Sequence, residues 1–172
     1  TSERKRHAAL LSQQRTLLRT LIDNLPDSIY IKDLNGRYLV NNAANTSMLG
    51  ANDEHDVIGK TVSDYFPPDF AQMYDADDKT VLQTGRAIID REEPYANGGT
   101  QGWFSTTKAP LRNAKGDIVG LIGITRDITE RRRTTERLRL SEANLAAAQR
   151  MAHLGSWELD LETSIMVSSE EL

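Results

Sequence analysis

The chain has 172 residues, with 21 Lys and Arg against 25 Asp and Glu, so its formal net charge is −4. This mild acidity argues against a chain that binds nucleic acid as a whole. Because the chain has no cysteine, it excludes disulfides, zinc–thiolate sites and thiol-dependent photochemistry. No apolar run approaches the roughly 20 residues of a membrane span, and the start has no signal-peptide pattern. Since the first residue is Thr1, we expect a longer parent protein.

Residues 1–24 are predicted to form an amphipathic helix. Leucine and isoleucine recur at helical spacing from Leu10 to Leu25, and Pro26 ends the pattern. The apolar stripe fits a helix packed on its own domain, and it fits equally well a coiled-coil arm that pairs two chains. Both interpretations stay open from the sequence.

Residues 25–127 have the pattern of a compact α+β unit. Two alternating segments, 28–32 and 37–41, read as strands. The Asn35-Gly36 pair between them predicts a hairpin, because both residues tolerate a positive φ. Three helical segments follow, each closed by a glycine: residues 42–49, 53–58 and 67–84. Three strands end the unit: residues 87–95, 102–110 and 118–125. We therefore predict a five-stranded antiparallel sheet with its helices on one face.

Residues 128–153 are predicted to form a second helix, with Thr129 as its N-cap and Gly155 beyond its end. Small and apolar residues form two stripes along it: Leu138, Ser141, Leu145, Ala148 and Ala152, and Leu140, Ala147, Met151 and Leu154. Two stripes are typical of a parallel coiled coil, so we expect a homodimer formed through the flanking helices. The basic run Arg131–Arg133 is read as a solvated face, without a nucleic-acid partner.

Several short motifs occur in one order along the middle of the chain: Leu25-Pro26-Asp27-Ser28-Ile29, Asp33-Leu34-Asn35-Gly36, Val40-Asn41-Asn42-Ala43, Val57-Ile58-Gly59-Lys60 and the run from Gly120 to Arg131. Together they resemble a PAS domain, the sensory module of bacterial and archaeal signalling proteins. The resemblance implies the PAS fold over residues 25–127, with flanking helices on both sides. Residues 154–172 resemble the first hairpin of a second, incomplete PAS domain.

The resemblance also bears on cofactors. Flavin-binding light sensors of the family carry a reactive Cys where this chain has Val62, and an Asn and a Gln where it has Phe104 and Thr125. Haem-binding members present a His from the long helix or the next strand, but residues 67–95 contain none. Flavin and haem are thus disfavoured, and no cofactor or metal site is predicted.

Strand alternation places Phe104, Thr106 and Lys108 on one face of their strand, and the resemblance implies that this face lines a cavity. A buried lysine is costly unless it is paired. We expect Lys108 to pair with Arg91, Glu92 or Glu93 of the neighbouring strand, either directly or by sharing a carboxylate ligand with one of them. The alternative is that the Lys108 side chain extends to the sheet edge. The candidate ligand-binding residues are Tyr74, Arg91, Glu93, Phe104, Thr106, Lys108, Leu121 and Thr125. Three acids of the long helix, Asp75, Asp77 and Asp78, are read as a solvated face.

The sequence therefore predicts a non-enzymatic sensory module. It would bind a small organic ligand of the carboxylate type and signal through Asp127, Ile128 and Thr129 to an output domain in the same parent chain, a histidine kinase or a cyclic-dinucleotide enzyme such as a diguanylate cyclase. The alternatives are an unliganded dimerisation and relay module and, more weakly, a haem or flavin redox sensor. We expect the module in the cytoplasm, whether or not the parent is anchored in a membrane.

Overall fold

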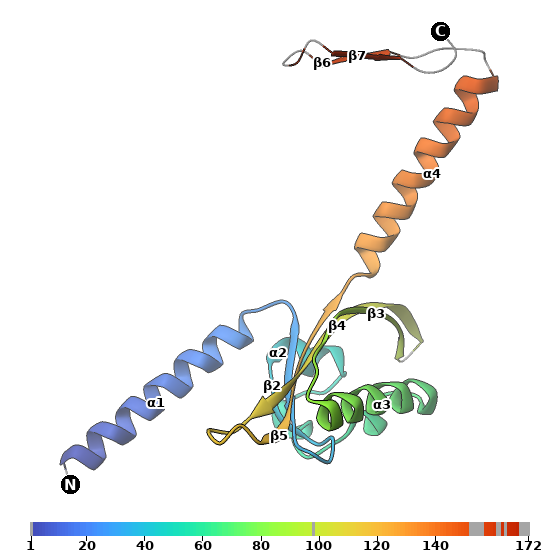
Figure 1. The fold of residues 1–172 in the computed structure, drawn as a ribbon. Coiled ribbons are helices and arrows are strands. Elements are labelled where there is room, and N and C mark those ends of the chain that lie inside the picture. The colour runs from blue at the N-terminus through green and yellow to red at the C-terminus, as the bar shows by residue number, and fades with distance from the viewer. Residues whose placement is uncertain (1, 98, 152–156, 161–162, 164, 169–172) are drawn as a thin grey trace. The chain divides into compact units, whose positions relative to one another are not determined.

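The computed structural model describes residues 2–97, 99–151, 157–160, 163 and 165–168 (Figure 1). The chain divides into two compact units, residues 1–129 and 130–172. The first unit contains a five-stranded sheet, and the second contains most of a long helix and a two-stranded sheet.

The five-stranded sheet is antiparallel throughout, with the strand order β2-β1-β5-β4-β3. Its strands are β1 (Ser28–Lys32), β2 (Tyr38–Asn41), β3 (Ile88–Asn97), β4 (Thr100–Arg112) and β5 (Ile118–Asp127). The predicted α+β fold with five antiparallel strands is confirmed. The last three strands are longer than the sequence pattern indicated, since cross-strand pairing extends them into the flanking polar segments.

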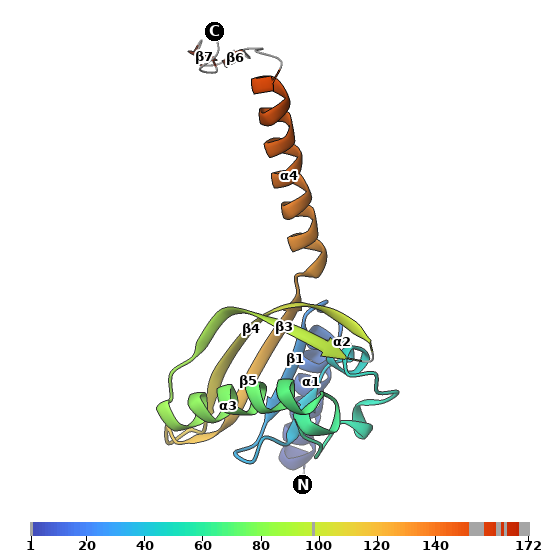
Figure 2. The same cartoon turned by 90° about the vertical axis from the view of Figure 1, so that its right-hand side faces the viewer.

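Four helical segments follow β2: α2 (Ala43–Met48), η1 (Glu54–Asp56), η2 (Val62–Asp64) and α3 (Pro68–Thr84). Helix α3 crosses one face of the sheet (Figure 2). It begins at the Pro67-Pro68 pair and ends at Gly85, whose φ of 65° lies in the left-handed region that favours glycine. The orientation of α3 decides which of its side chains reach the sheet.

The turn between β1 and β2 is stabilised by a different interaction from the one predicted. Of the Asn35-Gly36 pair, only Gly36 has a positive φ, at 75°. The carboxylate of Asp33 closes the loop instead, accepting hydrogen bonds from the backbone N–H groups of Asn35 at 2.8 Å and Arg37 at 2.9 Å. The predicted hairpin is present, but an Asx-type side-chain interaction holds it.

Helix α1 (Ser2–Asp23) is tied to the first unit at its C-terminal end. The Asn42 side chain donates to the carbonyl of Ile22 at 2.7 Å, and the Asp23 carboxylate accepts from the N–H of Ala43 at 2.9 Å. Five leucines of the helix remain exposed: Leu10, Leu11, Leu17, Leu18 and Leu21. Packing within the first unit therefore leaves the predicted apolar stripe uncovered, and pairing with a second chain stays a prediction.

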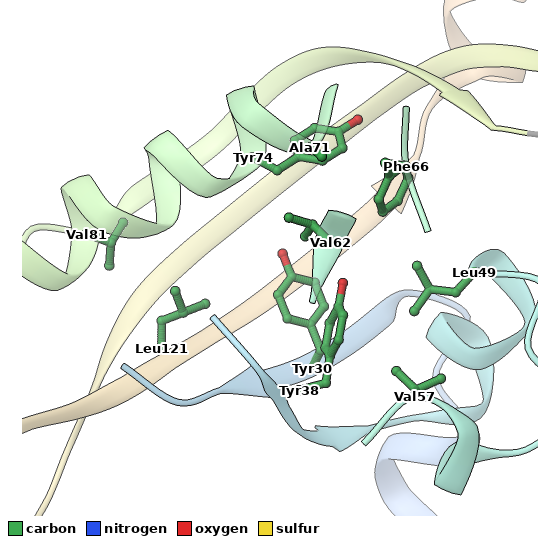
Figure 3. Close-up of a cluster of buried hydrophobic side chains, with 10 residues drawn as sticks. All are labelled: Tyr30, Tyr38, Leu49, Val57, Val62, Phe66, Ala71, Tyr74, Val81 and Leu121. Carbon is green, nitrogen blue, oxygen red and sulfur yellow. The ribbon is translucent and has the colours of Figure 1, made fainter. Parts of the chain in front are cut away.

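The core fills the space between α3 and the sheet. Figure 3 shows Val81 and Leu121 at one end of the cluster and Leu49 and Val57 at the other. Between them the rings of Tyr30 and Tyr38 meet edge to face, with their centroids 5.7 Å apart. Gly123 lies opposite Tyr30 on β5, and a Cβ atom at Gly123 would collide with the Tyr30 ring.

Helix α4 (Thr129–Met151) follows β5 and has no buried residue. Its predicted stripes include exposed side chains, among them Leu138 and Leu145, while Ala152, Leu154 and Gly155 lie outside the described residues. Strands β6 (Trp157–Asp160) and β7 (Ile165–Ser168) form an antiparallel hairpin. Its assignment to a second PAS domain stays a prediction. No helix in the described part of the chain has the length and apolarity to cross a membrane.

The substitution Gly123→Ala is expected to destabilise the protein by about 1–3 kcal/mol, because the added methyl group overlaps the buried Tyr30 ring. Urea unfolding monitored by circular dichroism measures the loss. In a Tyr30→Ala background the same substitution should be neutral or stabilising, since alanine is the better strand residue. Equal losses in both backgrounds would mean that the contact between Gly123 and Tyr30 is unimportant.

Candidate functional site

A cavity lies between the inner face of the sheet and the helical segments. Its volume is about 30 Å³, which is room for only a few small groups. Aromatic rings make up much of its wall, and two lysines and one glutamate add charge. The lining residues are Tyr30, Lys32, Tyr38, Met48, Val62, Phe66, Tyr74, Glu93, Phe104, Lys108 and Thr125.

Two buried lysines share one carboxylate at this cavity. The Nζ atom of Lys32 lies 2.7 Å from Oδ2 of Asp78, and that of Lys108 lies 2.7 Å from Oδ1. None of the three side chains is more than 3% exposed. Isolated charges at such depth are strongly destabilising, so the three groups depend on one another. We call them the ion cluster.

Three elements bring the ion cluster together. Asp78 projects from the inner face of α3, at the helical spacing set by Tyr74 and Val81. Lys32 ends β1, and its ammonium lies about 5 Å from the ring centroids of Tyr30 and Tyr38 (5.1 and 4.9 Å), which is cation–π geometry.

Lys108 comes from β4 and makes a second polar contact. Its ammonium donates to the backbone carbonyl of Tyr74 at 3.1 Å. Lys108 therefore contacts both a backbone carbonyl and a side-chain carboxylate of α3, which fixes the distance between the helix and β4.

The electrostatics of the ion cluster follow from burial and pairing. Burial by itself would raise the pKa of Asp78, but the ammonium groups of Lys32 and Lys108 outweigh it and hold that pKa below its usual value. Burial lowers the pKa of Lys32, and the Asp78 carboxylate opposes this effect only in part. With both lysines charged, the cluster carries one positive charge in excess.

Glu93 is the second acid of the cavity and is 4% exposed. Its Oε1 accepts a hydrogen bond from Oγ1 of Thr106 at 2.9 Å, and Thr106 in turn lies 3.4 Å from Oγ1 of Thr125. Its Oε2 is buried and has no hydrogen-bond partner among the described residues. Burial raises the pKa of Glu93, and the Thr106 hydrogen bond and the Lys108 charge partly counteract that rise.

The structure brings most of the predicted ligand-binding residues to one place. Those that line the cavity are Tyr74, Glu93, Phe104, Lys108 and Thr125. Thr106 is buried behind Glu93, and Leu121 is fully buried in the core. Arg91 lies apart from them, half-exposed and paired with Asp77 at 2.7 Å. Binding of a ligand by any of these residues stays a prediction.

Two predictions about charge were wrong. Lys108 does not extend to the sheet edge, and its direct carboxylate partner is Asp78 and not a residue of the neighbouring strand, because α3 lies over β4. A ligand that Lys108 shares with Arg91, Glu92 or Glu93 stays a prediction. Asp77 and Asp78 do not form a solvated face, since they are 8% and 2% exposed, whereas the Asp75 side chain is 42% exposed and pairs with Lys79. Helical spacing from the apolar Tyr74 and Val81 would have indicated Asp78.

Sequence reasoning missed Lys32 altogether. Alternation from Tyr30 places Lys32 on the inner face of β1, and that signal was available. A lysine at the end of a strand, next to a turn, is usually assigned to solvent. Burial of Lys32 depends on Asp78, which is 46 residues further along the chain.

A chain of contacts links the cavity to the end of the sheet. Phe104 lines the cavity, and its ring stacks on Tyr95 with centroids 4.0 Å apart and planes inclined by 13°. The Tyr95 hydroxyl donates to Oδ2 of Asp127 at 2.9 Å. A side chain at the cavity wall is thus two contacts away from the end of β5.

The segment after β5 is held by the backbone of Trp103. The carbonyl of Trp103 accepts from the N–H of Ile128 at 2.9 Å, and its N–H donates to Oγ1 of Thr129 at 2.9 Å. The prediction that Thr129 is the N-cap of the helix was wrong, since Thr129 is its first residue and its hydroxyl is engaged with Trp103. Asp127 instead accepts from the N–H of Thr129 at 2.9 Å.

No group of His, Asp and Glu side chains in the described ranges has the arrangement of a metal site. His55, which lies within the predicted domain of residues 25–127, is exposed. The arrangement at the cavity favours binding through charge and hydrogen bonds.

Comparison with known proteins places the chain among signalling sensors. The PAS fold family matches residues 22–133. The methanogenesis regulatory histidine kinase FilI of Methanothrix harundinacea is 29% identical over 128 residues, which are 70% of this chain and 13% of FilI. A diguanylate cyclase of Vibrio cholerae is 28% identical over 121 residues, which are 69% of this chain and 37% of the cyclase. The chain thus spans well under half the length of these relatives.

Solved structures with a similar fold include another PAS domain. The PAS domain of Bordetella pertussis BvgS superposes with a TM-score of 0.57 at 26% identity, covering 77% of this chain and 98% of that domain. VqmA bound to DPO superposes with a TM-score of 0.58 at 27% identity, covering 64% of this chain and 55% of VqmA.

Substitution of Asp78 by Asn is expected to destabilise the protein by about 3–5 kcal/mol, because it leaves two buried ammonium groups without a counter-charge. Asp75→Asn is the matched control, since it removes an exposed ion pair on the same helix and should cost about 0.5 kcal/mol or less. Chemical denaturation of both variants measures the difference. Equal effects would contradict a structural role for the ion cluster.

The stability of the protein should depend on the protonation of Glu93. Its pKa in the folded state lies above the ordinary value of 4.5, so between these two values the unfolded chain releases a proton that the folded chain keeps. Stability is therefore lost as the pH rises through this window. Glu93→Gln lacks this loss, so its stability relative to the native chain should increase from pH 4 to pH 7. A constant difference across that range would contradict the raised pKa.

Proposed function

Because the chain belongs to the PAS fold family, we propose that it is a sensory module that binds a small organic ligand in its cavity and passes a conformational change to an output domain. One observation carries the proposal. The cavity wall holds buried charged groups, and its Phe104 ring is connected through Tyr95 to Asp127 at the end of β5.

The charge of the ion cluster favours a ligand with a carboxylate. Lys32 and Lys108 share the single carboxylate of Asp78, so one positive charge is uncompensated within the ion cluster. A ligand carboxylate would supply the missing charge in a low-dielectric site, where such a pair is strong. VqmA, which is similar in fold, is bound to DPO in its structure, and this supports a bound organic molecule here.

Signal relay is proposed through Phe104, Tyr95 and Asp127. A ligand that displaces Phe104 would shift the stacked Tyr95 ring and alter the hydrogen bond of Tyr95 to Asp127. Asp127, Ile128 and Thr129 form the connection into α4, so the change would reach that helix directly. A ligand acts in this way only if it binds one of the two arrangements more tightly.

The relatives indicate the kind of output. FilI is a histidine kinase, and the second relative is a diguanylate cyclase. We propose that the parent of this chain is one of these two classes and acts in the cytoplasm as a homodimer. The exposed leucines of α1 and α4 support pairing of two chains through the flanking helices.

An unliganded dimerisation and relay module is the second candidate. The free space of about 30 Å³ favours it, because the core is already nearly filled. Mass spectrometry of small molecules released from the purified, denatured protein distinguishes the two candidates, together with a thermal-shift screen of organic acids. A retained compound, or an acid that raises the Tm, supports the sensor. The absence of both supports the unliganded module.

Substitution of Tyr95 by Phe tests the relay, because it removes the hydroxyl bonded to Asp127 and keeps the stacked ring. We expect amide hydrogen exchange at Ile128 and Thr129 to become roughly two- to tenfold faster, which corresponds to the net value of one hydrogen bond. The control is Tyr65→Phe, which removes a hydroxyl bonded to the Asp56 carbonyl. Unchanged exchange at Ile128 and Thr129 would contradict the relay.

A further inference from the structure

We propose that the cavity recognises a small hydroxy- or amino-carboxylate, whose carboxylate binds Lys108 and whose hydroxyl or ammonium group donates to Oε2 of Glu93. This inference rests on the proposed function, since it requires that the cavity binds a ligand. It adds a second recognition group, a hydrogen-bond donor, to the carboxylate that the ion cluster favours.

The first observation is the unsatisfied oxygen of Glu93. Glu93 lines the cavity and is 4% exposed, and its Oε2 has no hydrogen-bond partner among the described residues. The other oxygen, Oε1, is fixed by the Thr106 hydroxyl, which limits rotation of the carboxyl group toward another partner. Buried acceptors are seldom left unpaired, because burial without a partner costs their hydration. A donor from a bound molecule would satisfy this oxygen.

The second observation is the incomplete pairing of Lys108. Its ammonium has three N–H donors. The carbonyl of Tyr74 accepts one of them, and Asp78 is held by an ion pair at 2.7 Å in which Oδ1 makes no hydrogen bond with the described residues. Lys108 lines the same cavity as Glu93, and its hydrogen-bonding capacity is therefore not used up there. Both ammonium groups also lie near aromatic rings, that of Lys32 over Tyr30 and Tyr38 and that of Lys108 over Tyr74 at 5.7 Å. The sheet order separates the two lysines, because Lys108 is on β4, next to the strand that carries Glu93, whereas Lys32 is on β1, two strands further away. Lys108 is thus the lysine that can share a small ligand with Glu93.

The cavity therefore offers one donor with excess positive charge and one acceptor, surrounded by apolar walls. Its free space of about 30 Å³ restricts the ligand to a few non-hydrogen atoms. Met48 also lines the cavity, and the flexible methionine side chain is the part of the wall that adapts most easily. A three-carbon acid with one hydroxyl or ammonium group carries both recognition groups, and because it is larger than this free space, its binding requires the Met48 side chain or another part of the wall to move. A single water molecule that bridges Glu93 and Lys108 is the competing occupant.

Isothermal titration calorimetry of the 172-residue chain with four acids of similar size tests the inference. Lactate and alanine carry a donor next to the carboxylate, whereas pyruvate and propionate carry none. We expect lactate or alanine to bind at least tenfold more tightly than both pyruvate and propionate. Equal affinities for lactate and propionate would overturn the role of Glu93 and leave the proposed function intact.

Binding of none of the four acids, with a bridging water alone in a crystal structure, would overturn the inference. The proposed function would still be decided separately, by mass spectrometry of retained compounds.

Variants of the cavity residues locate the contacts with the ligand. Glu93→Leu should remove the preference for lactate over propionate, and Lys108→Met should weaken all four acids. Lys79→Met is the matched control, because Lys79 is an exposed lysine of α3 that pairs with Asp75 outside the cavity, and it should change no affinity. Loss of the preference in this control would also overturn the assignment.

Discussion

The carboxylate of Asp78 holds the helical layer to the sheet. It binds an ammonium from β1 and another from β4, two strands that are not neighbours, since β5 lies between them. Charges at this depth are stable only when paired, so the position of α3 over the sheet and the burial of both lysines depend on each other. The apolar contacts around Val81 and Leu121 add to this attachment, and the ion pairs fix one turn of α3 above β1 and β4.

The same constraint creates the candidate site. Asp78 pairs with Lys32 and Lys108 in the interior, so the wall of the cavity carries charged groups. The rest of the cavity is lined mainly by aromatic rings. Stability by itself does not require these buried charges, since apolar residues of similar volume are often as stabilising as a buried ion pair. The retained charge, the free oxygen of Glu93 and the stacked pair of Phe104 and Tyr95 together favour recognition and relay over simple packing.

Local patterns in the sequence predicted the elements well. The strands, the long helix between Pro68 and Gly85, and the shared face of Phe104, Thr106 and Lys108 follow from periodicities that a short segment carries by itself. The inward direction of that face was implied by the resemblance to PAS domains. Predictions about the partners of charged residues failed, because a partner depends on which elements pack together. Asp78 and Lys108 are 30 positions apart in different elements, and nothing local to either residue indicates the other. The hydroxyl of Thr129 was misassigned for the same reason, since its partner Trp103 comes from an adjacent strand.

By itself, the sequence determined that the chain is an α+β PAS module, that it has no thiol chemistry, and that apolar stripes run along its flanking helices. These properties depend on composition, on residue spacing and on motifs in a fixed order. The tertiary structure alone decided that Lys32 is buried, that Asp78 binds both lysines, and that one oxygen of Glu93 is buried without a hydrogen-bond partner among the described residues. The physical reason is that the energy of a charge depends on its desolvation and on its neighbours in space, and both are set only when α3 packs across the sheet.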